Sequence, residues 1–276
     1  MSGQLDDMED IITMDTNQKE SVTLEVLIEL METLLSERGC PWDRKQTKDS
    51  LKPYLIEESY EVVEAVDERD PLKIKEELGD LLFQIVFYSQ LLQKEDGIDI
   101  YDIIEAVHRK MVRRHPHVFG EVTVNGADEV VVNWEQIKQE EKKAERSSVL
   151  DGVPKELPSL LRAHRLQSKA SSVGFEWENF HQILEKLDEE FSELRQAYKH
   201  GDIEEIEDEF GDLLFVLVSI ARFLHVNPDN ALRKAISKFT ARFTHVERKV
   251  KEMDKEWNDM TTEEMERLWN EAKKYQ

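Results

Sequence analysis

The chain has 276 residues, 60 acidic and 37 basic side chains, a net charge of −23 and 39% hydrophobic residues. This balance argues against a nucleic-acid-binding protein and against docking on an anionic membrane, because both partners attract a basic surface. No apolar run approaches the ~18–20 residues that cross a bilayer, and the acidic N-terminus does not resemble a signal peptide. Cys40 is the single cysteine, so we expect no intramolecular disulfide and a soluble, cytoplasmic protein.

The predicted elements are almost all helical. Apolar residues recur every three or four positions from Leu24 to Leu35, which indicates one amphipathic helix, and a turn follows at 39–43. The remaining predictions, in chain order, are an acidic mobile tail at 1–20, helices at about 51–66, 74–92 and 100–114, a loop at 120–133 with two possible short strands at 122–124 and 130–132, and a polar helix at 134–146.

The chain repeats itself, with most motifs offset by 132 residues. Glu57-Glu58-x-x-Glu61 recurs as Glu189-Glu190-x-x-Glu193, and Glu77-Leu-Gly-Asp80 recurs as Glu209-Phe-Gly-Asp212. Chance does not keep the order and spacing of such motifs, so the chain consists of two copies of one helical module. We predict an all-α fold with two tandem four-helix modules, at 21–146 and 161–276, joined by a linker at 147–160.

The acidic motifs do not fit a purely solvated helix face, which is the usual explanation of E-x-x-E in so acidic a chain. On a helical wheel with Leu55 at zero, Glu58 falls at about 300°, inside an apolar arc that runs from about 260° to 20°. Glu190 takes the same place relative to Leu187. A charged residue in the middle of the apolar stripe of both copies predicts that these acids face inward.

The next helix of each copy carries a second pair of acids on one side, at positions i and i+3. They are Glu77 and Asp80 in the first copy and Glu209 and Asp212 in the second. Gly79 and Gly211 lie between the two acids, where a missing side chain would let another helix approach closely.

Buried carboxylates that repel one another need a positive partner. These helices offer no equally regular set of bases, so a divalent cation is the simpler partner, and oxygen-only ligands suit Mg²⁺, with Mn²⁺ as a possible substitute. We therefore predict one Mg²⁺ site between the two helices of each module. The ligands are Glu58, Glu61, Glu77 and Asp80 in the first module, and Glu190, Glu193, Glu209 and Asp212 in the second.

Together with Gly-Cys-Pro-Trp-Asp at 39–43 and Arg-Arg-His-Pro-His-Val-Phe at 113–119, these motifs resemble the MazG nucleoside triphosphate pyrophosphohydrolase family over residues 21–276. The resemblance implies Mg²⁺-dependent hydrolysis of ribo- and deoxynucleoside triphosphates to monophosphate and pyrophosphate, with broad base tolerance and a role in nucleotide-pool control. It also implies a homodimer whose helices complete the sites, with the second module as the main catalytic one. Glu57 and Glu189, just outside the predicted ligands, are candidates to orient or deprotonate the attacking water.

Basic and aromatic residues are expected to hold the nucleotide. The resemblance points to Lys238, Arg242, Trp269 and Lys273 in the second module. The spacing of Lys110 with Arg114, and of Trp134 with Lys138, suggests counterparts in the first module, where helix-end cations are the alternative for Lys110 and Arg114. Lys186 is a further predicted nucleotide contact. The family pattern can place a base before the second E-x-x-D, but Glu205 stands in that stretch here.

Three other functions stay open. A di-iron bundle would use Glu105-x-x-His108 and Glu178-x-x-His181, but these are not repeat mates. A non-catalytic helical scaffold would need no metal. A dUTPase-like enzyme would have the same acids and a narrow pyrimidine site.

Overall fold

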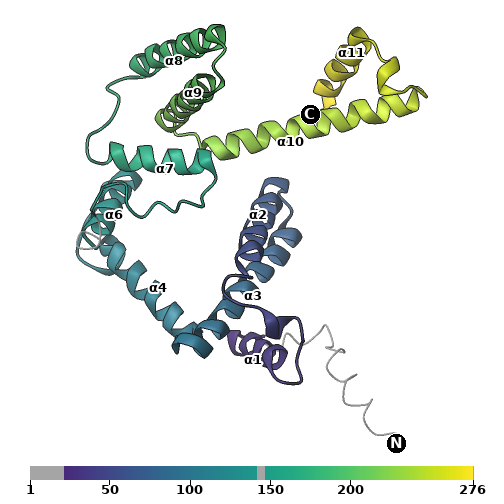
Figure 1. The fold of residues 1–276 in the computed structure, drawn as a ribbon. Helices are drawn as coiled ribbons and strands as arrows, with labels where there is room; N and C mark the ends of the chain where they lie inside the picture. Colours follow the sequence, from purple (N-terminus) through teal and green to yellow (C-terminus); the bar gives the residue numbers. More distant parts are fainter. Residues whose placement is uncertain (1–21, 142–146, 276) are drawn as a thin grey trace, which may run out of the picture. The chain divides into compact units, whose positions relative to one another are not determined.

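A computed structural model of the chain describes residues 22–141 and 147–275, and every regular element within these ranges is a helix (Figure 1). The chain divides into two compact units, residues 1–138 and 139–276. The tail predicted at 1–20 lies outside the described residues. The prediction of a duplicated all-α fold is confirmed, while the module limits predicted from the sequence stay predictions.

In the first unit, a long helix hairpin forms the centre, with shorter helices packed at its base. Its buried core contains Met31, Leu51, Val86, Phe87 and Leu91. The helices are α1 (Leu24–Leu35), η1 (Asp43–Lys45), α2 (Lys52–Glu68), α3 (Pro71–Asp96), α4 (Ile100–Arg114), α5 (Pro116–Phe119) and α6 (Ala127–Glu141). The hairpin consists of α2 and α3, and α1 packs against α3.

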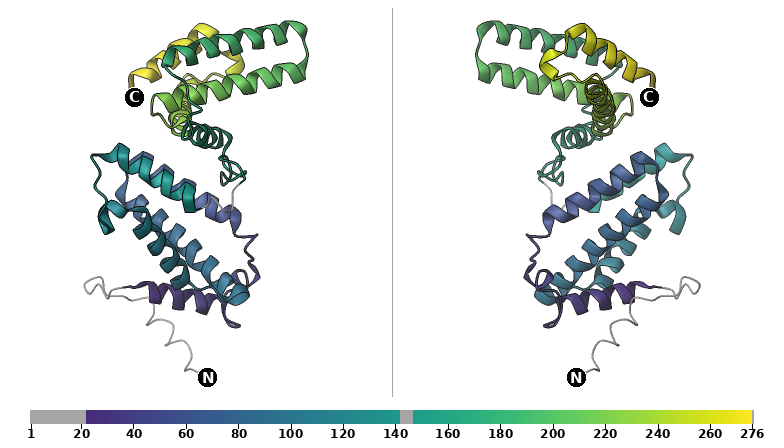
Figure 2. Two further views of the ribbon diagram at one scale, coloured as in Figure 1. Left: turned by 90° about the vertical axis from the view of Figure 1, so that its left-hand side faces the viewer. Right: turned by 90° about the vertical axis from the view of Figure 1, so that its right-hand side faces the viewer.

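The second unit repeats the hairpin and adds a long arm. Its helices are α7 (Ser159–Ser171), α8 (Phe180–His200), α9 (Ile203–Phe223), α10 (Pro228–Glu252), η2 (Trp257–Asp259), α11 (Thr262–Ala272) and η3 (Lys273–Tyr275). The antiparallel pair α8 and α9 is seen side by side in Figure 2. At the far end of α10, a second core of Val246, Val250, Met260 and Leu268 holds α11 against it.

The two hairpins turn in the same way, at positions offset by 132 residues. Arg69 ends α2 in the left-handed region at φ 59°, and Gly201 ends α8 at φ 78°. Asp70 and Asp202 follow as N-caps, and their side chains accept hydrogen bonds from backbone N–H groups of the first turn of the next helix. The shared turn fixes the register of the two helices, and with it the rows of acidic side chains that they carry.

An ion pair ties the loop before α8 to the end of α9. Arg222 donates two hydrogen bonds of 2.5 Å to the two carboxylate oxygens of Glu176, and Ser171 also donates to Glu176. The guanidinium lowers the pKa of Glu176 to about 2, with Ser171 and the backbone N–H of Trp177 acting in the same direction. Because the pair is bidentate and partly buried, it holds the hairpin more firmly than an exposed pair would.

Three local predictions are wrong. Residues 130–132 lie inside α6, which begins at Ala127 rather than near 134, and residues 122–124 form no strand. A Cβ built on Gly79 or Gly211 would meet nothing within 4 Å, so no other helix approaches these glycines among the described residues. The β-branched residues at 130–132 favour a strand by their local propensity, but they lie inside a longer helix. The end predicted for this helix, at 146, lies outside the described residues.

Candidate active site

The first acidic cluster joins the two helices of the hairpin. Glu58 of α2 and Glu77 and Asp80 of α3 each offer a carboxylate oxygen, and these oxygens all lie within 4.8 Å of one another. Glu58 and Glu77 are half-buried, and Asp80 is exposed. Glu61, the fourth predicted ligand, is exposed and lies outside this group of three. Asp80 nevertheless offers an oxygen to the same cluster as Glu58 and Glu77, and the role of Glu61 as a ligand stays a prediction.

Burial and mutual repulsion disfavour the charged forms in this cluster. Partial burial raises the pKa of Glu58, and the carboxylates of Glu61 and Asp80 raise it further. The pKa of Glu77 is raised for the same reasons, by burial first and then by Glu61, Glu76 and Asp80. Such a cluster gains stability from a bound cation, because the cation replaces repulsion by attraction.

The second acidic cluster has the same construction and is deeper. Glu190 and Glu193 of α8 and Glu209 of α9 place carboxylate oxygens within 4.8 Å of one another. Glu190 is only 4% exposed, in agreement with its position on the helical wheel. Burial raises the pKa of Glu209, and the charges of Glu193, Glu190 and Asp212 add to this effect. Asp212 is exposed and lies outside the group of three, and its role as a ligand stays a prediction.

A lysine accompanies the second cluster, although these helices carry no set of bases as regular as the acids. The Nζ atom of Lys186 lies 2.8 Å from a carboxylate oxygen of Glu190 and 2.8 Å from one of Glu189. These two hydrogen bonds raise the pKa of Lys186 above its ordinary value. Lys186 was predicted as a nucleotide contact, and in the structure its partners are a predicted ligand and a predicted catalytic acid.

The donor sets fit a hard divalent cation. Each cluster gathers three carboxylates from two helices at a spacing that one ion can bridge, and it contains oxygen donors only. Mg²⁺ and Mn²⁺ accept such ligands, whereas Zn²⁺ favours His and Cys. Glu58, Glu77 and Asp80 would hold the ion in the first unit, and Glu190, Glu193 and Glu209 in the second. The exposed acids Glu61 and Asp212 stand beside them.

A hollow of about 180 Å³ lies beside the first cluster, toward the end of the hairpin where α2 turns into α3. This volume is below the ~300 Å³ of small-molecule pockets, so it suits a hydrated ion and phosphate groups rather than a whole nucleotide. A base and a sugar would need additional side chains around them. The hollow is lined by Glu61, Glu64, Ala65, Glu68, Lys73, Glu76 and Glu77.

The predicted basic and aromatic residues form an Arg–Trp pair in each unit. The guanidinium carbon of Arg114 lies 5.3 Å from the ring centroid of Trp134, and that of Arg242 lies 5.8 Å from Trp269. Phe239 also contacts Trp269, at 5.4 Å between ring centroids. The offset between Arg114 and Arg242 is 128 residues rather than 132, and the paired geometry supports their equivalence.

The predicted lysines lie near these pairs. Lys138 forms an ion pair of 3.0 Å with Glu135, and Lys273 donates a hydrogen bond of 3.0 Å to Asn270. Lys110 lies on α4 and Lys238 on α10, each one turn before the arginine of its pair.

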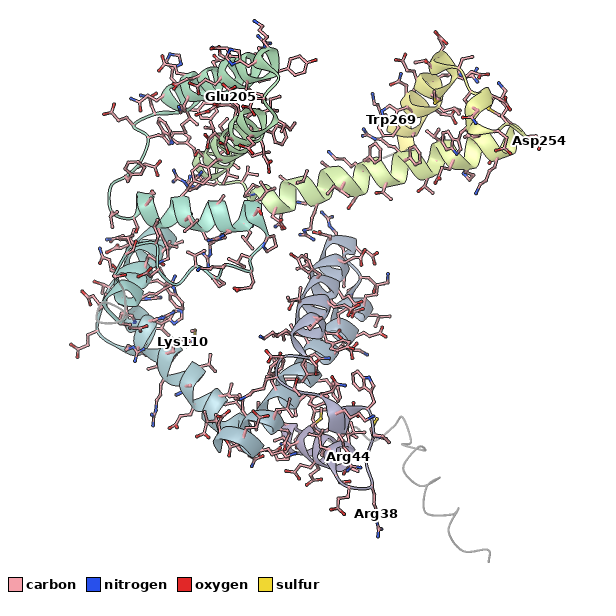
Figure 3. The ribbon with its side chains drawn as sticks, in the orientation of Figure 1. Arg38, Arg44, Lys110, Glu205, Asp254 and Trp269 are labelled. Atoms are coloured by element: carbon pink, nitrogen blue, oxygen red, sulfur yellow. The ribbon has the colours of Figure 1, made fainter. Side chains whose placement is uncertain are left out.

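The structure does not bring the basic–aromatic groups to the acidic clusters within a unit. In Figure 3, Trp269 lies on α11 beside the distal half of α10, away from the hairpin that carries Glu205. Lys110 lies on α4, which diverges from the hairpin of α2 and α3 (Figure 3). Acids and basic–aromatic residues are thus two separate halves of a candidate site.

The two predicted catalytic acids are exposed. Glu57 lies on α2 beside Glu58, and its charge adds to the raised pKa of Glu58. Glu189 lies on α8 beside Glu190, and its carboxylate is 2.8 Å from Lys186 Nζ. Both carboxylates are placed next to a cluster rather than within it, as their proposed role requires.

One functional candidate, Lys73, was missed from the sequence. It lines the hollow and forms an ion pair of 2.5 Å with Glu68. At the equivalent place in the second hairpin the acid and the base exchange positions: Glu205 replaces Lys73, His200 replaces Glu68, and the two lie 3.3 Å apart. Aligning the repeat residue by residue, rather than motif by motif, would have revealed this exchange.

Comparisons with known proteins agree on one family. The profile of the MazG nucleotide pyrophosphohydrolase domain matches residues 46–119 and 178–247. "Nucleoside triphosphate pyrophosphohydrolase/pyrophosphatase MazG" of Thermotoga maritima is 43% identical over 91% of this chain and 96% of its own length. "Nucleoside triphosphate pyrophosphohydrolase" of Escherichia coli K12 is 41% identical over 90% of this chain and 96% of its own. "Uncharacterized protein YabN" of Bacillus subtilis is 46% identical over 88% of this chain and 50% of its own.

The described helices include none that combines the length and the apolar character needed to cross a membrane.

Proposed function

This chain belongs to the MazG nucleotide pyrophosphohydrolase family, and from that premise we propose that it is a Mg²⁺-dependent enzyme of broad base tolerance. It hydrolyses nucleoside triphosphates to the monophosphate and pyrophosphate. Ribo- and deoxynucleotides are both substrates, and control of the nucleotide pool is its role. The observation that carries the proposal is the pair of three-carboxylate clusters, one between the helices of each hairpin.

The residues of the second unit divide the work in the following way. Glu190, Glu193 and Glu209 would hold Mg²⁺, which would offset the charge that develops on the triphosphate oxygens. Glu189 orients the attacking water and accepts its proton. Lys186, within reach of Glu189 and Glu190, is placed to contact a phosphate. The first unit uses Glu58, Glu77, Asp80 and Glu57 in the same way. The remaining predicted ligands are Glu61 in the first unit and Asp212 in the second.

The separation of the two half-sites supports a homodimer. Arg242 and Trp269 lie away from the hairpin of their own unit, so a partner chain would bring them to its acids. Apolar side chains also remain exposed on α9 and α10, where Phe215 and Phe239 are 46% and 57% exposed. Large exposed apolar surfaces mark interaction sites. We propose that a second copy covers this surface and that its Arg–Trp pair stacks on the base and binds the phosphates.

A pyrophosphate-release assay tests the proposal. The substrates are ATP, GTP, CTP, UTP and dUTP with Mg²⁺, and the proteins are the wild type and the double variants Glu61→Gln/Glu77→Gln and Glu193→Gln/Glu209→Gln. Each variant keeps the size of the side chains and removes two of the four acidic charges predicted to bind one ion. We expect the second variant to lose most of the activity. Activity on dUTP alone would favour a dUTPase-like enzyme, and unchanged activity in both variants would refute the metal assignment.

A further inference from the structure

The two acidic clusters differ in the base that faces them. In the second hairpin, Lys186 is paired with Glu190, whose side chain is 6% exposed. The equivalent position in the first hairpin is Tyr54, which packs edge-on against Trp42 with the ring centroids 5.8 Å apart. The pKa of Glu58, the counterpart of Glu190, is shifted mainly by burial and by the carboxylates of its neighbours. Lys186 therefore supplies a counter-charge at a position where the first module has none.

The first hairpin has a lysine elsewhere. Lys73 of α3 forms an ion pair with Glu68. Its effect on the pKa of Glu77 is smaller than the effects of burial and of three neighbouring carboxylates. The counterpart of Lys73 is Glu205, whose charge adds to the repulsion around Glu209. The lysine of the first module thus lies at the rim of its hollow, and the lysine of the second module is bonded directly to a buried carboxylate.

An ammonium and a divalent cation compete for the same oxygens. Glu190 has little access to solvent, so a hydrogen bond from Lys186 weakens the attraction of its carboxylate for a metal ion. The same ammonium is a donor that phosphate oxygens attract. If a phosphate draws Lys186 away, the carboxylate becomes available to the ion.

We propose that Lys186 competes with the divalent cation for Glu190, so that the second module binds Mg²⁺ more weakly than the first and binds metal and triphosphate cooperatively. This inference rests on the proposed function, because it assumes that the clusters hold Mg²⁺ and that a phosphate chain lies beside them. The first module, with Tyr54 in place of the lysine, binds its ion without such coupling.

Isothermal titration of the full-length protein with MgCl₂ tests the proposal. The variant Glu58→Gln/Glu77→Gln disables the first cluster and isolates the second. In that background, Lys186→Met removes the ammonium while keeping an unbranched side chain that favours a helix. Lys199→Met is the matched control, because it removes one positive charge from the same helix about 13 Å along its axis from Glu190. Circular dichroism verifies that all variants keep their helix content.

We expect Lys186→Met to tighten Mg²⁺ binding about tenfold and Lys199→Met to leave it unchanged. In the wild-type background, Lys186→Met should raise the KM for ATP, the opposite direction from its effect on Mg²⁺. A purely structural role would weaken both. Unchanged or weaker Mg²⁺ binding in Lys186→Met overturns the competition. Tighter Mg²⁺ binding with an unchanged KM overturns the coupling to phosphate. No Mg²⁺ binding in this background or in Glu193→Gln/Glu209→Gln would instead refute the metal assignment of the proposed function.

Discussion

Replacing Glu176 by Gln should destabilise the second unit in a way that depends on pH. The Arg222 guanidinium, with smaller contributions from Ser171 and the backbone N–H of Trp177, lowers the pKa of Glu176 from 4.5 to about 2. At 1.36 kcal/mol per pKa unit this corresponds to at most ~3.4 kcal/mol. The side chain of Glu176 is 32% exposed and that of Arg222 is 15% exposed, so solvent screening reduces the contribution to about 2 kcal/mol.

The sign follows from the lowered pKa. The folded state holds the proton of Glu176 less tightly than the unfolded state, so the stabilisation is complete above the unfolded pKa of 4.5. It is lost as the pH falls toward the folded pKa of about 2, and about half remains at pH 3. Glu176→Gln removes the charge at every pH, so its cost should be largest at neutral pH and shrink in acid.

Urea unfolding followed by circular dichroism measures this effect at pH 7 and pH 3. The control is Glu252→Gln, which removes an exposed partner of Arg248 and Lys249 on α10 and should leave the unfolding free energy unchanged. The reasoning fails if Glu176→Gln costs no more than this control at pH 7, or if its cost is the same at both pH values.

Three further predictions concern the metal, the turns and the base. Mg²⁺ should raise the thermal unfolding midpoint at pH 7.5 and lose this effect toward pH 5, because the raised pKa values of Glu58, Glu77 and Glu209 let protons compete with the ion. Scanning fluorimetry at constant ionic strength measures the midpoint, and an equal shift at both pH values would contradict this prediction. Arg69→Gly should stabilise the first hairpin by about 1 kcal/mol and Gly201→Ala should destabilise the second by about as much, because both residues adopt the left-handed backbone conformation. Urea unfolding midpoints that move the other way would refute this. Trp269→Ala should raise the KM for ATP and GTP alike and change kcat little in the pyrophosphate-release assay. An increase in KM for only one of these nucleotides would mean that Trp269 recognises a particular base rather than stacking on any base.

Local patterns predicted the hairpins and the approximate position of their acids. The helical wheel placed Glu190 in the apolar arc, and it is buried; the same wheel placed Glu58 there, and it is half-buried. Helix periodicity is strong in α2, α3, α8 and α9, and the repeat gave two independent readings of the same pattern. A wheel shows the direction of a side chain and not the distance to the next helix, so it does not by itself predict how exposed Asp80 and Asp212 are.

Other features carried weaker signals or none. Lys186 precedes Glu189 and Glu190 by three and four residues, the spacing of helical ion pairs, so this contact was visible in the sequence and was overlooked. By contrast, Glu176 and Arg222 are far apart in the chain and no motif links them. The separation of Trp269 from the hairpin depends on the direction of α10, which follows from packing against α7 and α9 rather than from any local pattern.

The tight turns between paired helices have a consequence for the order in which the protein folds. Glu58 and Glu77 are separated by about 20 residues, and so are Glu190 and Glu209, so each acidic cluster is closed by a short loop. Loops of this length close in well under a microsecond, and structures rich in local contacts fold fast. Each hairpin can therefore form on the ribosome as soon as its own residues emerge, and the first can be complete before α10 and α11 have been synthesised.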